Sequence, residues 1–177
     1  KPYCTDGFIG KSLKEKHVTA EEIKQRVGDE IWNSYTKIVP IRNPWDQTVS
    51  LYFWRKRKRP FFYYPYRWIF KLKFKKLIEH QISFTEWIHN KRKWINENRD
   101  IMLIDGKLDD YFYIRFEHLN EDFKKLCTNL NIPFDSNSFP HEKGGHRPGK
   151  KYHEHYDEET KNIVAEAFDM EIDEFGY

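Results

Sequence analysis

Two short apolar segments, residues 37–41 and 111–116, are each followed by a longer segment whose apolar positions recur every three or four residues. A short apolar run bounded by turn residues is typical of a buried strand, and recurrence at three and four positions is typical of a helix with one buried face. The helix after the first strand presents Val49, Tyr52 and Phe53 towards a core. Two strand-then-helix units in succession predict an α/β architecture with parallel strands.

Capping boxes mark the starts of two other helices. Residues 19–22 and 83–86 each carry Thr or Ser followed three positions later by Glu, a pairing that satisfies exposed N–H groups at a helix start. The first box predicts a short helix that runs to Val27 and is closed by Gly28. The second predicts a helix that extends to about Arg99. Its apolar positions are Phe84, Trp87, Ile88, Trp94 and Ile95.

The remaining regular elements lie in the second half of the chain. Asp105 and Gly106 predict a turn before the second strand, and Asn120 is the expected cap of the helix that follows it. That helix is expected to stop before Pro133, and a last helix to begin near Asp157. The apolar positions expected on the buried faces of these two helices are Phe123, Leu126, Cys127, Leu130, Ile163, Val164, Ala167 and Phe168.

Two segments predict no regular element. Residues 55–76 form a basic aromatic insertion, with ten lysines and arginines and no acid. Residues 136–152 form a polar loop rich in Gly, Pro, His and Lys. The insertion favours contact with a polyanion. The alternative is a solubilising surface segment whose aromatic side chains partly join the core.

Length and composition predict one soluble domain spanning residues 1–177. Hydrophobic residues make up 38%, aromatic residues 18% and charged residues 33% of the chain, and the formal net charge is +3. No apolar run is long enough to span a membrane. Cys4 and Cys127 are too few and too far apart for a disulfide framework, so a reducing, cytoplasmic location is expected.

A metal is not expected. The sequence contains several histidines in and after the polar loop, but their spacing matches no ligand pattern for a structural or catalytic metal. These residues are His141, His146, His153 and His155.

The junction between the first strand and its helix carries the clearest chemical signal. Arg42 follows the strand directly, Asn43 suits a helix cap, and Pro44 suits the first helical position. An arginine beside a helix N-terminus favours an anion such as phosphate, both by the helix dipole and by bidentate hydrogen bonding. Open α/β sheets bind ligands at this end of their strands. The alternative is an arginine paired with a surface carboxylate and a serine, Ser50, on a solvated helix face.

This stretch resembles a signature of the sulfotransferase family, in which an apolar strand precedes Arg-Asn-Pro and a Ser lies eight residues after the Arg. The resemblance implies that Arg42 and Ser50 bind the 3′-phosphate of the sulfate donor, 3′-phosphoadenosine 5′-phosphosulfate (PAPS). It covers residues 17–177, including the Phe-Glu-His-Leu segment at 116–119 and the closing Phe-Gly-Tyr at 175–177.

The resemblance also implies a P-loop-NTPase-like parallel sheet flanked by helices. Family members begin with a strand and a phosphate-binding loop, containing Pro-Lys, Gly and Thr or Ser, that hold the 5′-phosphosulfate. No such loop is found in this sequence. The chain therefore resembles a sulfotransferase without its N-terminal strand and loop.

Sulfuryl transfer also requires a base that takes the proton of the acceptor hydroxyl. His17 is the candidate, because many family members place a histidine at about this interval before the arginine, and histidine titrates near neutral pH. The alternative for His17 is a surface histidine near a helix N-terminus. Glu117 is the other candidate base, although its place after the second strand favours a structural hydrogen bond.

The polar loop supplies two further candidates. The family has a late basic loop, containing glycine, that closes over the 3′-phosphate, and Arg147 and Lys150 lie at the corresponding place. The alternative is a solvated loop.

The sequence thus predicts a sulfotransferase that moves a sulfuryl group from PAPS to a hydroxyl, expected to be that of a carbohydrate. The alternative is a non-catalytic module on a degenerate sulfotransferase fold, which binds nucleic acid or an acidic glycan through residues 55–76.

Overall fold

The computed structural model describes residues 18–56, 82–92, 95–96, 99–135, 149 and 151–177. Within these ranges it contains seven α-helices, a two-stranded parallel sheet and a short antiparallel hairpin, so the expected α/β class is confirmed. The contacts group the chain into two compact units. Unit 1 comprises Lys1–Ile41 and Glu97–Phe134, and unit 2 comprises Arg42–Asn96 and Asp135–Tyr177.

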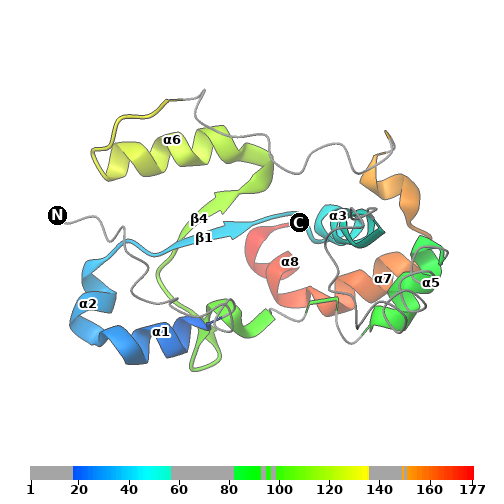
Figure 1. Cartoon of the computed structure of the whole chain (residues 1–177), viewed down its shortest axis with the longest axis horizontal. Helices are drawn as coiled ribbons and strands as arrows, with labels where there is room; N and C mark the ends of the chain where they lie inside the picture. Colours follow the sequence, from blue (N-terminus) through cyan, green and yellow to red (C-terminus); the bar gives the residue numbers. More distant parts are fainter. Residues whose placement is uncertain (1–17, 57–81, 93–94, 97–98, 136–148, 150) are drawn as a thin grey trace, which may run out of the picture. The chain divides into compact units, whose positions relative to one another are not determined.

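Unit 1 is built on the parallel pair of strands that the sequence predicts. Strand β1 (Ile38–Ile41) pairs with β4 (Phe112–Arg115), and the two lie side by side in Figure 1. Helix α6 (Leu119–Asn129) follows β4 and packs against it, burying Leu126 and Cys127 as expected. The strand-then-helix prediction is therefore confirmed for this part of the chain, but the expected burial of the first strand is not: in β1 only Ile41 is buried, and Ile38 is 45% exposed.

Helices α1 (Ala20–Val27) and α2 (Asp29–Ser34) complete unit 1 together with the hairpin of β2 (Leu103–Ile104) and β3 (Lys107–Leu108). The predicted first helix is confirmed, and α2 was not predicted. The predicted turn at 105–106 joins the two hairpin strands, and both of its residues have positive φ. This backbone matches the twist of the flanking strands.

The start of α6 differs from the sequence-based prediction. A 3₁₀ turn, Phe116–His118, precedes the helix, and α6 begins at Leu119, so Asn120 lies inside the helix rather than at its cap. The Asp122 carboxylate accepts the backbone N–H of Arg115 at 3.1 Å, which fixes the first turn of α6 against the end of β4. Leu130, expected to be buried, is 38% exposed.

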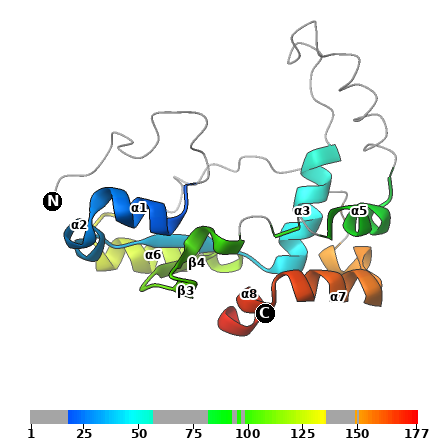
Figure 2. The same cartoon turned by 90° about the horizontal axis from the view of Figure 1, so that it is seen from below.

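Unit 2 is a cluster of helices around an aromatic core. Helix α3 (Pro44–Lys56) packs against α5 (Phe84–Lys91) and α7 (Glu158–Ala167), and α8 (Asp169–Phe175) packs on α7 (Figure 2). The buried core residues of this unit are Val49, Tyr52, Phe84, Trp87, Ile88, Ile95, Ile163, Val164 and Phe168. All nine are positions that the apolar spacing predicts.

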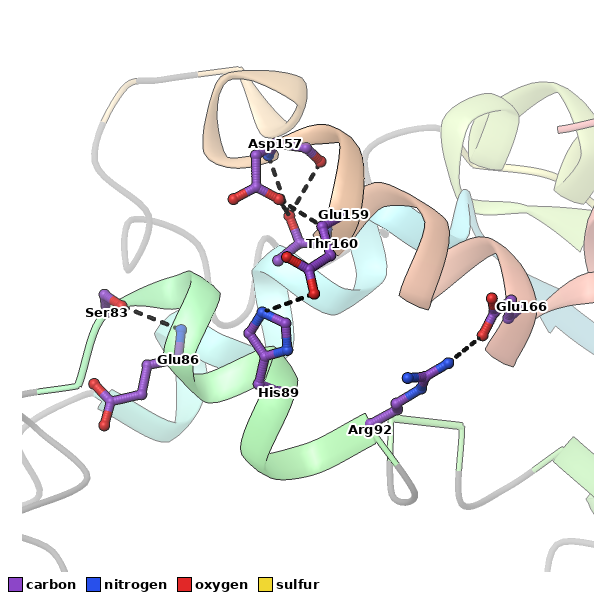
Figure 3. A network of polar contacts seen from close by, with 8 residues as sticks. All are labelled: Ser83, Glu86, His89, Arg92, Asp157, Glu159, Thr160 and Glu166. Carbon is purple, nitrogen blue, oxygen red and sulfur yellow. Dashed lines mark hydrogen bonds and ion pairs between the residues drawn. The ribbon is translucent and has the colours of Figure 1, made fainter.

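Polar contacts join α5 to α7 at the surface of unit 2 (Figure 3). Arg92, directly after α5, forms an ion pair with Glu166 at 2.6 Å, and the His89 ring lies 3.8 Å from the Glu159 carboxylate. Each helix also begins with a side-chain cap. The Ser83 hydroxyl accepts the N–H of Glu86 at 3.1 Å, and the Asp157 carboxylate accepts the N–H of Thr160 at 2.8 Å.

Two helix boundaries in unit 2 were predicted wrongly, and one prediction is confirmed. Helix α5 ends at Lys91 rather than near Arg99. The last helix, expected to begin near Asp157, is confirmed as α7, whereas α8, which follows Phe168, was not predicted. Phe168 leaves the helical backbone conformation and places a buried side chain in the core. The second wrong boundary is the C-terminal end of α3. This helix extends to Lys56, so the first two residues of the expected 55–76 insertion are helical. Residues 57–76 lie outside the described residues.

No helix in the described ranges is both long enough and apolar enough to cross a membrane.

Candidate anion site at the start of helix α3

Local sequence sets the start of α3. The Asn43 side chain accepts the N–H of Asp46 at 3.1 Å, and the Asn43 carbonyl accepts the N–H of Gln47 at 2.9 Å. Asn43 is therefore the N-cap, and Pro44 occupies the first helical position, where its missing N–H costs nothing. The first turn of this helix begins two residues after Arg42, as the sequence predicts.

Three polar side chains meet at this helix start. The Arg42 guanidinium donates from Nε to the Asp46 carboxylate at 2.8 Å, and its Nη2 donates to the same oxygen. Its Nη1 lies 3.5 Å from the Ser50 hydroxyl. Residues four and eight positions after Arg42 fall on one face of the helix, which is why one guanidinium reaches both. The structure thus brings together the two residues expected to bind the 3′-phosphate.

This arrangement agrees with the alternative in one respect, the pairing of Arg42 with a carboxylate, and differs from it in exposure. Arg42 does pair with a carboxylate, but the side chain of Asp46 is only 15% exposed and that of Arg42 24% exposed. Ser50 is half-buried. Because partial burial lowers the local dielectric, a charge-assisted hydrogen bond here is stronger than one on an open surface. The Asp46 carboxylate also fixes the plane of the guanidinium, so that its Nη1 side faces Ser50.

Contacts from the C-terminal part of unit 2 hold the first turn of α3. The Tyr156 hydroxyl donates to the Trp45 carbonyl at 2.8 Å, and the Trp45 indole N–H donates to the Lys161 carbonyl at 3.1 Å. Tyr156 directly precedes the N-cap of α7, and Lys161 lies in that helix. Sequence reasoning did not identify Tyr156 or Trp45, because nothing local links positions 111 residues apart.

The environment of Tyr156 keeps its hydroxyl protonated. Burial raises the pKa of Tyr156 well above its ordinary range, and the nearby Asp46 carboxylate raises it further. The ring packs edge-on against Phe84, with the ring centres 4.9 Å apart. The Tyr156 hydroxyl therefore stays protonated, and able to donate a hydrogen bond, at neutral pH and well above it.

The other predicted site residues are not placed beside Arg42. His17, Arg147 and Lys150 lie outside the described residues. Glu117, the second candidate base, is exposed in the 3₁₀ turn after β4, in unit 1. Their proposed roles stay predictions.

Two residues of the basic insertion, Arg55 and Lys56, lie within the described part of the chain. Lys56 Nζ donates to the Tyr52 hydroxyl at 2.9 Å and to the Ile82 carbonyl at 3.2 Å, and it lies over the Tyr52 ring. Arg55 is exposed at the end of α3. Lys56 thus stabilises unit 2, and polyanion binding by the insertion stays a prediction.

Searches for related proteins return no match, whether against models of protein families, curated protein sequences or solved structures. The described residues also contain no group of three or more His, Cys, Asp or Glu side chains that could hold a metal ion. The candidate anion site, made of an arginine, a serine and a capped helix start, is therefore the feature of the described residues that bears on function.

Proposed function

We propose that this chain is a P-loop-like α/β sulfotransferase domain that transfers a sulfuryl group from PAPS to a carbohydrate hydroxyl. The observation that carries the proposal is the approach of Arg42 Nη1 to the Ser50 hydroxyl, 3.5 Å, beside the capped start of α3. A phosphate seated there accepts from the guanidinium and the serine hydroxyl, and it is favoured by the helix dipole.

In the proposed reaction, the acceptor oxygen attacks the sulfur of PAPS in line. The new bond joins that oxygen to sulfur, and the bond from sulfur to the 5′-phosphate oxygen breaks. The hydroxyl proton passes to His17, and the products are a sulfate ester and 3′-phosphoadenosine 5′-phosphate. Arg42 and Ser50 fix the donor by its 3′-phosphate, assisted by Arg147 and Lys150, so their contribution is one of positioning.

The proposal is tested by calorimetric titration with two nucleotides that differ only in the 3′-phosphate. These are 3′-phosphoadenosine 5′-phosphate and adenosine 5′-phosphate. The wild-type chain should prefer the first. Arg42→Ala should weaken its binding by about 1 to 3 kcal/mol, or about 5- to 150-fold in Kd, the scale of a charge-assisted hydrogen bond. Ser50→Ala should weaken it in the same direction by a smaller factor, because the serine is uncharged.

Arg92→Ala is the matched control. It also removes an arginine of unit 2 that pairs with a carboxylate, the 2.6 Å pair with Glu166 shown in Figure 3, but it leaves the start of α3 intact. Its affinity for both nucleotides should equal that of the wild type. Equal affinity of Arg42→Ala and wild type for 3′-phosphoadenosine 5′-phosphate would contradict the site.

The competing function, polyanion binding without catalysis, gives a different result. A polyanion-binding module would bind single-stranded nucleic acid with a steep dependence on salt and would not distinguish the two nucleotides. Arg55→Ala should then reduce nucleic-acid binding, whereas Arg42→Ala should not.

A further inference from the structure

One tyrosine hydroxyl connects the start of α7 with the start of α3. Tyr156 donates to the carbonyl of Trp45, the second residue of α3 and the neighbour of Asp46. A helix carbonyl can accept two hydrogen bonds, so this contact adds to the helix rather than competing with it. The hydroxyl therefore restrains the turn that carries the Asp46 carboxylate, and through Asp46 it restrains the Arg42 guanidinium.

A second contact acts on the same residue from the same helix. The Trp45 indole donates to the Lys161 carbonyl at 3.1 Å, so the backbone and the side chain of Trp45 are both held from residues 156–161. Thr48, which is 1% exposed, donates to the Pro44 carbonyl at 2.8 Å within the same turn. These contacts fix both the position and the rotation of the first turn of α3.

Rotation of this turn matters because the anion site depends on alignment along one helix face. Arg42 precedes the helix, whereas Asp46 and Ser50 belong to it. A small rotation of α3 about its axis would move both helix residues away from the guanidinium, and the Nη1 to Ser50 distance is already at the outer limit for a hydrogen bond. The site is therefore sensitive to whatever sets that rotation.

We propose that Tyr156 is a positioning residue for the 3′-phosphate site, and that its hydroxyl holds the first turn of α3 so that Arg42 and Ser50 face the same phosphate. This inference rests on the proposed function, because it concerns the same site. It adds a residue, 106 positions from Ser50 in the chain, whose loss should affect recognition of one phosphate specifically.

The experiment compares Tyr156→Phe with Tyr52→Phe. Tyr156→Phe keeps the ring against Phe84 and removes only the hydroxyl. Tyr52→Phe removes the hydroxyl of another tyrosine in the same unit. That hydroxyl donates to the Ile82 carbonyl at 3.0 Å and accepts from Lys56 Nζ at 2.9 Å, and neither contact involves the first turn of α3. For each protein, calorimetry gives the ratio of the Kd for adenosine 5′-phosphate to that for 3′-phosphoadenosine 5′-phosphate, and a thermal melt gives its stability.

Tyr156→Phe should lower the ratio by about fivefold, the effect of one buried neutral hydrogen bond transmitted to the site. Tyr52→Phe should leave the ratio within about twofold of the wild type, although its melting temperature should fall at least as far as that of Tyr156→Phe, because it loses two hydrogen bonds. A merely structural role for Tyr156 predicts the same fall in melting temperature and no change in the ratio, and that outcome would overturn the inference. An equal loss of the ratio in Tyr52→Phe would overturn it as well.

Two further outcomes separate this inference from the proposed function. If the wild type does not prefer the 3′-phosphorylated nucleotide, the proposed function fails and the inference fails with it. The other outcome is that the wild type prefers the 3′-phosphorylated nucleotide and Arg42→Ala loses this preference, but Tyr156→Phe keeps the full ratio. In that case only the positioning role of Tyr156 fails. Should Tyr156→Phe not fold, Trp45→Phe decides, since it removes the indole contact to Lys161 and should lower the ratio in the same direction; an unchanged ratio would overturn the inference.

Discussion

Truncation of Ile88 tests the closed core that supports α3. Ile88 is fully buried in α5, within the cluster that includes Val49 of α3 and Val164 of α7. Because α5 and α7 both contact α3, a cavity at this position weakens the packing of the helix that carries the anion site. The informative substitutions are Ile88→Val and Ile88→Ala, since they shorten the side chain without adding a polar group.

The expected cost follows from the groups removed. Ile88→Val removes one carbon group and Ile88→Ala removes three, which at about 0.8 kcal/mol each amounts to about 0.8 and about 2.4 kcal/mol of lost transfer free energy. The cavity left in a fully buried site adds to these values. The total expected loss of unfolding free energy is about 1 kcal/mol for Ile88→Val and about 2 to 5 kcal/mol for Ile88→Ala.

Urea denaturation followed by far-ultraviolet circular dichroism measures both losses. The control is Ile31→Ala, the same chemical change at a helical position that is 50% exposed, which should alter the unfolding free energy by no more than about 0.5 kcal/mol. If Ile88→Ala costs less than about 1 kcal/mol, or no more than Ile31→Ala, the reasoning that α5 closes the core over α3 is refuted.

Two further predictions concern unit 1. Hydrogen bonding from Lys125 lowers the pKa of Asp122 against the opposing effect of burial, and the hydrogen bond from the Arg115 N–H lowers this pKa further. Asp122 therefore stabilises the fold above its unfolded pKa of about 3.9, and this contribution is lost as the pH falls through the lower folded pKa. Asp122→Asn should therefore reduce the dependence of the unfolding free energy on pH between about pH 5 and pH 2. If unfolding free energies from urea denaturation fall equally with pH in Asp122→Asn and in the wild type, the prediction is wrong. Gly106 has a φ of 74° in the hairpin turn, so Gly106→Ala should cost about 1 to 2 kcal/mol in urea denaturation. Gly149→Ala, where φ is not in the left-handed region and a Cβ meets no atom within 4 Å, is its control and should change stability by less than about 0.5 kcal/mol.

The helix starts were the features most readily predicted from sequence. Thr19, Ser83 and Asp157 all act as N-caps whose side chains accept an N–H three residues later. Such a cap is made entirely by neighbouring residues, so its geometry is encoded in a few letters of sequence. The same holds for the turn at residues 105–106, where both residues adopt positive φ.

The helix ends and one helix start were decided by packing. Apolar spacing continues past Lys91, but Ile95 reaches the core from a turn rather than from a helix. Asn120 is a suitable cap by type, yet α6 starts one residue earlier, after a 3₁₀ turn, where Asp122 accepts the N–H of Arg115 at the end of β4. In both cases more than one local solution satisfies the sequence pattern, and contacts with the rest of the fold select one.

The anion site likewise depends partly on local sequence and partly on contacts between distant residues. The sequence by itself determined its first half: the strand, the Asn43 cap and the spacing of Arg42, Asp46 and Ser50 are local, because residues four apart share a helix face. Only the tertiary structure decided how that turn is held, through Tyr156, because a hydroxyl and a carbonyl separated by 111 residues leave no pattern along the chain. Local hydrogen bonds specify where the helix begins, and packing between distant segments specifies which way its side chains face.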